Sequence, residues 1–265
     1  MSKVKIKGNA SGTGVLTIEA PNTDTDSTIT LPDGTGELIQ ADASGNVGIG
    51  TDNPAQKLSL DSGYVQVGNG ISGAGGVKYP YSSANADCRN WRTRSDIVEY
   101  GDWGLEQSTT QSGETYSNKF RVSQAGYVTM PSQPAFFAVK SGHLMEVSGT
   151  TVLTGWSINV NVGSHFNSSN GRFTAPVAGR YVFLQSMMSG TTSGDVQFRI
   201  VKNGGVWAGS NNMNAGAQWR QTTVTAVVNL SVGDYVTFDA YSSVSSSNHL
   251  VYQSTYSHVS GYLIG

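Results

Sequence analysis

The sequence predicts an all-β protein whose C-terminal half is a jelly-roll sandwich, and three observations support this prediction. Glycine accounts for 33 of the 265 residues, and Ser, Thr and Asn fill the gaps between short apolar runs, which suits strands and tight turns rather than helices. Apolar and polar residues alternate with a period of two along most of these runs. The segment 171–183, GRFTAPVAGRYVF, is a strand that enters a Pro-Val-Ala-Gly corner and leaves as a second strand. Such a corner is typical of a jelly roll.

Residues 1–60 are predicted to form an elongated trimeric β-stem. The runs VLTIEA, STITLPDG and GNVGIGTDNPAQKLSL alternate, but each is short and only lightly apolar. A two-stranded hairpin of this kind is marginally stable in water. We therefore expect identical chains to supply the missing faces of these strands.

Residues 61–133 are predicted to form a small middle β-domain and a linker. This region carries more charge and clustered aromatic residues, and CRNWRTRS places Trp91 and Thr93 on one face and Arg92 and Arg94 on the other. The closing segment GYVTMPSQPAF is similar to the earlier GNVGIGTDNP, and we interpret both as strands that lead out into linkers.

Residues 134–265 contain longer strands, enough for about eight and for two sheets roughly 10 Å apart. In GRYVFLQSMM, Tyr181 and Phe183 share one face, and the opposite face is also apolar. A sheet of a sandwich has only one inner face, so a strand that is apolar on both sides predicts contact with another subunit. Threefold symmetry would also close exposed sheet edges. The candidate trimer-interface residues are Val182, Leu184 and Met188.

Composition argues against several functions. Charged residues make up 13% of the chain and the net charge is −2, so nothing predicts binding to nucleic acid or to an anionic membrane. Cys88 is the single cysteine, which excludes an intrachain disulfide and predicts an inert side chain. No apolar run approaches the roughly 20 residues that span a bilayer, and the start MSKVKIKGNASG has no secretory signal. We expect synthesis in a cytoplasm.

Catalysis and cofactor binding are not predicted. The four histidines are far apart in the sequence and lack metal-ligand spacing. The glycine-rich GNGISGAGG lacks the Lys-Ser/Thr of a phosphate loop. NTDTDS at 22–27 lacks the glycine and the distal glutamate of a calcium loop, although a structural divalent ion there stays an open alternative. The C-terminal half holds only four acidic residues, and none forms a convincing acid pair.

Alternating strand directions place the loops 189–194, 209–217 and 242–249 together at one end, and the turns 203–205 and 231–234 together at the other. The family resemblance given below implies that the termini lie near the stem, which makes the loop end distal and the turn end the stem end. The distal loops are uncharged and rich in Ser, Asn and Gly. Their amides and hydroxyls suit sugar hydroxyls, and Trp207, Met213, Trp219 or Tyr241 would add an apolar surface. The alternative, that these loops only keep the domain soluble, stays open. The receptor-binding candidates are Thr191, Thr192, Asn211, Asn212, Met213, Asn214, Trp219, Ser246, Asn248 and His249.

The segments NGRFTAPVAGRYVF, LSVGDYV and SGYLIG resemble the globular domain of complement C1q and its tumour-necrosis-factor-like relatives over residues 134–265. The resemblance implies a jelly roll that assembles as a compact trimer. It also implies core positions at Phe166, Phe173, Gly179, Tyr181, Phe183, Phe198, Gly233, Gly261 and Tyr262.

The segments ITLPDGTGELI, GNVGIGTDNPAQKL and VTMPSQPAF resemble the repeated β-linkers of bacteriophage tail fibres, especially those of phages that infect marine bacteria. This resemblance implies a homotrimeric tail fibre of the virion, made in the host cytoplasm. Its N-terminal end would attach to the tail or an adaptor protein, and its C-terminal knob to a host surface glycan or protein. One alternative is a purely structural virion protein, such as a head fibre or a fibre spacer. A polysaccharide-degrading tailspike is disfavoured because the knob has few carboxylates.

Overall fold

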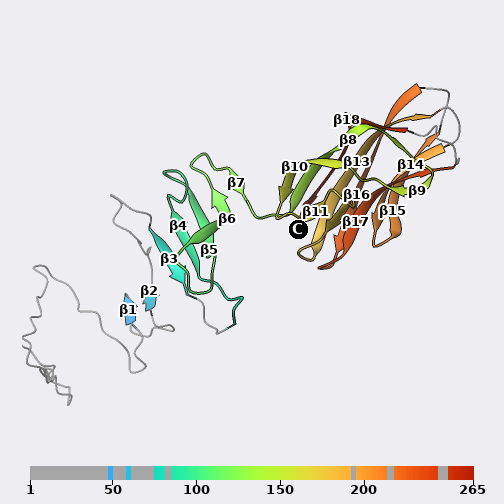
Figure 1. The fold of residues 1–265 in the computed structure, drawn as a ribbon. Helices are drawn as coiled ribbons and strands as arrows, with labels where there is room; N and C mark the ends of the chain where they lie inside the picture. Colours follow the sequence, from blue (N-terminus) through green and yellow to red (C-terminus); the bar gives the residue numbers. More distant parts are fainter. Residues whose placement is uncertain are drawn as a thin grey trace, which may run out of the picture. The chain divides into compact units, whose positions relative to one another are not determined.

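The structure is a computed structural model that describes residues 47–49, 58–60, 75–80, 85–191, 195–213, 218–243 and 250–265. Most of the predicted stem lies outside these residues, as do NTDTDS and all of GNGISGAGG except its last two glycines. In the N-terminal part, β1 (Val47–Ile49) pairs in parallel with β2 (Leu58–Leu60). All described elements are strands, in agreement with the predicted all-β class (Figure 1).

The middle region is an antiparallel sheet in which consecutive strands are neighbours. A buried carboxylate holds the loop before its central strand. Asp102 accepts the backbone N–H groups of Ile97, Val98 and Glu99 at 2.6, 3.0 and 3.2 Å, and Arg121 Nε at 2.7 Å. These donors lower the pKa of Asp102 against the opposing effect of its burial, so the carboxylate stays charged. The strands are β3 (Gly76–Tyr79), β4 (Trp91–Ser95), β5 (Trp103–Ser108), β6 (Tyr116–Val122) and β7 (Val128–Thr129).

The C-terminal region is a two-sheet sandwich of jelly-roll type (Figure 1). The first sheet has the order β10-β8-β18-β13-β16. Its strands are β8 (Ala135–Glu146), β10 (Trp156–Val162), β13 (Gly179–Thr191), β16 (Gln218–Leu230) and β18 (Leu250–Leu263). The second sheet has the order β11-β12-β17-β14-β15, and β9 also pairs with β17. Its strands are β9 (Gly149–Val152), β11 (Phe166–Asn167), β12 (Arg172–Thr174), β14 (Asp195–Lys202), β15 (Gly205–Met213) and β17 (Tyr235–Ser242).

Aromatic rings fill the space between the two sheets. Phe136 stacks on Phe166 with ring centroids 4.4 Å apart, and Phe173 contacts Phe183 at 5.4 Å. The hydroxyl of the fully buried Tyr181 donates to the carbonyl of Val177 at 2.8 Å, so its burial leaves no unpaired donor. The core positions predicted at Phe166, Phe173, Tyr181, Phe183 and Phe198 are all buried.

Two of the predicted core positions are wrong. Tyr262 is 52% exposed, because its neighbour Gly261 faces inward and successive side chains of a strand point to opposite faces. Gly233 is an exposed turn residue whose φ of +84° lies in the left-handed region that favours glycine.

The two turns at the stem end are bonded to each other. Asn203 (φ +48°) and Gly204 (φ +84°) form the tight hairpin that the sequence predicts. Asn203 Nδ2 donates to Asp234 Oδ1 at 2.8 Å, and Tyr235 N donates to Asn203 Oδ1 at 2.9 Å. The β14–β15 turn and the turn before β17 therefore share one end of the sandwich, as expected from the alternating strand directions.

Candidate functional site

The outer face of the first sheet is the most distinctive surface of the sandwich. In β13, Tyr181 and Phe183 point into the core, so Val182 and Leu184 point outward. Val182 lies opposite Val227 on one side and Tyr262 on the other, and Leu184 lies opposite Thr225. These register pairs continue the outward face across neighbouring strands.

This outer face is apolar and almost free of charge. Val227 and Tyr262 on it are more than half exposed, and β8 and β10 extend it with apolar side chains. Two charged side chains of the described residues lie on the face, both near its ends: Arg180 at the stem end of β13, and Glu146 in the row of Gly190, Leu250 and Trp219 at the distal end. A contiguous exposed apolar surface of this kind is typical of a protein–protein contact. The outer-face apolar residues are Ala135, Phe137, Val139, Val160, Val162, Val182, Leu184, Met188, Trp219, Val227 and Tyr262.

A histidine is built into the same face. His258 lies opposite Ser186 and Val139 in the sheet, and its ring centroid is 5.6 Å from that of Phe137. Partial burial lowers the pKa of His258, because the neighbouring surface solvates a charged imidazolium poorly. The face therefore favours the neutral form of this side chain.

The structure places the predicted interface residues Val182, Leu184 and Met188 on this face, each half-buried within the single chain. Their contact with another subunit stays a prediction. Sequence analysis missed Phe137, Val139, Val160, Val227 and Tyr262 as members of the same face. The run AFFAV at 135–139 carried the signal, since it is apolar on both sides of the strand just as GRYVFL is.

The ends of the strands meet at the end of the sandwich opposite the stem-end turns. Gly190 pairs with Trp219 and with Leu250, and Ser242 pairs with Val196. The loops that the sequence assigned to this distal end connect these strand ends. Thr192, Asn214, Ser246, Asn248 and His249 themselves lie outside the described residues, and Thr191, Asn211, Asn212 and Met213 are described by their main chain. Their role in receptor binding stays a prediction.

Trp219 is the receptor-binding candidate whose side chain the structure places. Its ring lies against Gly190, where a Cβ atom would be 2.8 Å from two ring carbons. The absence of a side chain at Gly190 thus lets the indole lie flat on the sheet, with nearly half of the residue exposed. Trp207 is a correction to the sequence interpretation: it lies two residues beyond the stem-end hairpin, where its Nε1–H donates to the Val227 carbonyl at 3.1 Å.

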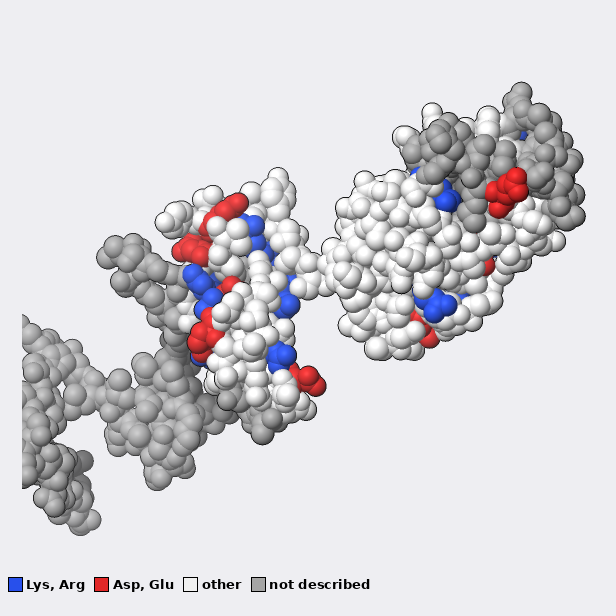
Figure 2. Space-filling model, in the orientation of Figure 1, with Lys and Arg blue, Asp and Glu red and all other residues white. Residues whose placement is uncertain are grey.

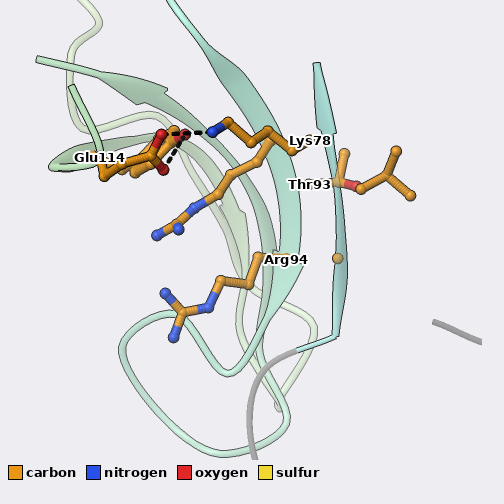
Figure 3. A pocket seen from close by; sticks show the side chains of 8 residues that line it. Lys78, Thr93, Arg94 and Glu114 are labelled. Atoms are coloured by element: carbon orange, nitrogen blue, oxygen red, sulfur yellow. Dashed lines mark hydrogen bonds and ion pairs between the residues drawn. The ribbon is translucent and has the colours of Figure 1, made fainter. Parts of the chain in front are cut away.

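A hollow of about 290 Å³ opens on the charged face of the middle sheet (Figure 3). Lys78 Nζ and Glu114 Oε1 are 2.5 Å apart, a contact that raises the pKa of the lysine and lowers that of the glutamate. Arg92 lies 3.8 Å over the Tyr116 ring and its Nε contacts Glu106 at 2.7 Å. These contacts neutralise much of the charge, so the lining offers a mixed polar surface without a nucleophile–base pair.

Charge is distributed unevenly over the described surface. Charged side chains gather on the middle sheet, whereas the visible face of the sandwich is mostly uncharged (Figure 2). Within the described residues, no group of three or more His, Cys, Asp or Glu side chains is arranged to hold a metal ion. Cys88 is a free, half-buried thiol. The described part of the chain contains no helix of the length and apolarity needed to cross a lipid bilayer.

Among known protein families, the C1q domain matches residues 135–264. The chain is similar to the globular domain of zebrafish complement 1qA protein, with 18% identity, a TM-score of 0.42 and coverage of 50% of this chain and 98% of that one. It is also similar to Eiger TNF from S. frugiperda, with 11% identity, a TM-score of 0.44 and coverage of 51% and 94%. Murine APRIL matches with 10% identity, a TM-score of 0.39 and coverage of 50% and 99%.

Proposed function

We propose that the chain is a non-enzymatic, homotrimeric fibre protein of a bacteriophage virion. Its C1q-type knob, residues 134–265, attaches the virion to a glycan or protein of the host surface through the distal loops. The outer face of the first sheet holds the three knobs together. The stem side connects the knob to the tail or to an adaptor protein.

The observation that carries the trimer is the apolar outer face, which carries few charges. Leaving a surface like that of Val182, Val227 and Tyr262 in water costs roughly 25 cal/mol for each Å² of apolar area. Rotational symmetry brings the same face of each copy together, and a closed ring leaves no further copy of the face exposed. The resemblance to C1q domains implies a compact trimer, which supports three copies.

The attachment function is supported by the arrangement of the knob. The minimal, mutually bonded turns lie at one end, and the strands that carry the longer uncharged loops end at the other. Loops on a rigid sandwich are where recognition usually resides. Trp219 adds a flat apolar surface at that end, and the β-linker segments of the first 133 residues resemble those of phage fibres.

The trimer is tested by measuring the mass of the full chain in solution with light scattering. We expect three times the chain mass of 27.9 kDa. Leu184→Asp at the centre of the face, and Val227→Asp at its edge strand, should both shift the mass from that of three chains toward that of one. Val206→Asp is the matched control, because Val206 is 57% exposed and Val227 is 54% exposed, but Val206 lies on the second sheet. A wild-type chain that is monomeric at nanomolar concentration would contradict the proposal.

Attachment is tested by adding purified full chain to host cells before the virus. We expect the protein to compete with virions and to lower their adsorption in proportion to the sites occupied. A trimer that binds no host cells would instead favour a structural head fibre or spacer. Release of reducing ends from host polysaccharide by the protein would contradict the non-enzymatic assignment.

A further inference from the structure

The middle sheet has no buried apolar core of its own. Every buried Ala, Val, Leu, Ile, Met, Phe, Trp or Tyr in the described part of the chain lies at or beyond Phe136, in the sandwich. Besides Gly104, the residues that the middle sheet buries are polar, namely Asn90, Asp102, Glu106 and Ser108. Because sheets depend on an apolar face packed against another layer, a five-stranded sheet with this burial pattern is incomplete as a single chain.

Register divides the sheet into two unlike faces. On one face the charged groups pair with each other: Arg92 with Glu106, Lys78 with Glu114, and Arg121 with Asp102. The opposite face crosses all five strands, and Trp103 and Phe120 meet on it edge to face with centroids 6.3 Å apart. No Lys, Arg, Asp, Glu or His is among the residues that the register places on it, and Lys119 is the extra residue of the β5–β6 bulge, without a register partner. The residues in register are Val77, Tyr79, Trp91, Thr93, Ser95, Trp103, Leu105, Gln107, Ser117, Phe120, Val122 and Val128.

The missing charge indicates what covers this apolar face. Residues that lie close to a rotation axis approach their own copies, so a charged residue there would face like charges. A partner of a different kind would tolerate charges on this face, and would gain orientation from them. The segregation of all ion pairs to the other face is the distribution that self-association requires.

We propose that the apolar face of the middle sheet packs against the same face of two further copies of this chain. The three sheets would then enclose a shared core that includes Trp91, Trp103, Leu105 and Phe120. This inference rests on the proposed trimer and extends it from the knob into the middle region. The three charged faces, with the hollow at Lys78 and Arg94, would remain in contact with solvent.

Cysteine labelling of the full chain tests the inference without disturbing the fold. In a Cys88→Ser background, Val77→Cys and Val128→Cys place thiols on the two edge strands of the apolar face. Val98→Cys, in the loop after β4, is the control off the face. These valines are 43%, 56% and 63% exposed in the single chain, so the isolated chain predicts similar reaction rates with a maleimide. We expect the two face cysteines to react about tenfold more slowly than the control in the assembled protein, as protected sites do.

Mass and labelling together separate this inference from the proposed function. A single-chain mass overturns both proposals. A threefold mass with equal rates at the three cysteines leaves the trimer intact and overturns the shared middle core. In each of the variants Val77→Cys and Val128→Cys, a short bismaleimide should also cross-link the introduced cysteines of two different chains. Protection without any such link would mean that another segment of the same chain covers the face, which overturns the inference.

Discussion

Gly261 shows how one residue sets the packing between the two sheets. A Cβ atom at this position would overlap the Phe183 ring and lie 2.7 Å from Phe136 Cε1. Both rings are held by further aromatic neighbours, so neither moves without disturbing the core. Gly261→Ala should therefore lower the free energy of unfolding by about 2 kcal/mol, as overpacking substitutions do.

Urea unfolding followed by circular dichroism measures this effect. Gly205→Ala is the control, because a Cβ atom there would meet only the Lys202 carbonyl at an ordinary 3.5 Å. Equal stability of Gly261→Ala and the wild type would show that the two rings repack at no cost.

Lys140 is a buried lysine without a carboxylate partner among the described residues. Its Nζ reaches the carbonyls of Ser141 and Gly155 at 3.4 Å, and burial lowers its pKa. Long bonds to neutral carbonyls offset little of the cost of burying a charge. Lys140→Met should thus raise the free energy of unfolding by about 1 kcal/mol.

The same substitution at Lys202 provides a control of opposite sign. Lys202 Nζ donates to the Asn229 carbonyl at 2.7 Å and lies 3.2 Å from Asp234 Oδ2, so Lys202→Met should destabilise the fold. A Lys140→Met protein less stable than the wild type in urea would show that the buried ammonium holds the Gly155 turn in place.

At the residue scale, sequence analysis predicted inward aromatic residues well and outward ones poorly. Phe173, Tyr181 and Phe183 alternate with less apolar neighbours or follow a corner signal, so their direction is fixed by the period of a strand. Tyr262 follows a glycine whose direction no alternation reveals. Trp207 was wrongly assigned to the distal end. The end that a residue occupies depends on its distance along β15, and composition does not reveal that distance.

At the scale of elements, the first sheet couples its outer face to pH through His258. Burial lowers the pKa of this imidazole below its ordinary value near 6.5, so the folded chain binds fewer protons than the unfolded one as the pH falls through that region. The contribution of His258 to the free energy of unfolding is then fully present above about pH 6.5 and is lost as the pH decreases. Packing against another copy would bury the ring further, so acid should also weaken the trimer.

Sedimentation velocity between about pH 7.5 and pH 5.5 measures this loss, and the His range makes this the informative window. We expect the wild type to shift toward smaller species at the acid end, and His258→Gln to keep one distribution across the range. A His258→Gln protein that dissociates over the same pH interval would assign the effect to another group.

Strand existence was predictable, whereas strand irregularity was not. The strand patterns of GRYVFL and VQFRIVK indicated β13 and β14. The dipeptide Asn203-Gly204 indicated the hairpin that joins β14 to β15. The irregular pairing of β18 with β8 between Ser254 and His258 has no such pattern, because it depends on contacts such as the bond from Met188 N to Ser257 Oγ across the sheet. The division of the middle sheet into a charged and an uncharged face was visible in part, through WRTR at 91–94.

At the scale of the whole molecule, two separate sheets leave an apolar face without cover in the single chain. One is the outer face of the first sheet of the sandwich, and the other is the apolar face of the middle sheet. Both carry few charged groups, which suits a surface that meets its own copies. One symmetric assembly would cover both faces of each chain. It would also present three copies of the distal loops.

Trimer formation should therefore determine the affinity of the protein for the host cell surface. Weak single-site binding becomes strong when three sites engage together, because the second and third events occur at a high effective concentration. Val227→Asp, which leaves the distal loops intact, should bind host cells about 100-fold more weakly than the wild type. Fusing a three-stranded coiled coil to the N-terminus of this variant should restore most of the affinity. Equal binding by the single-chain variant and the wild type, measured by titration of labelled protein on cells, would show that one knob is sufficient and that avidity plays no part.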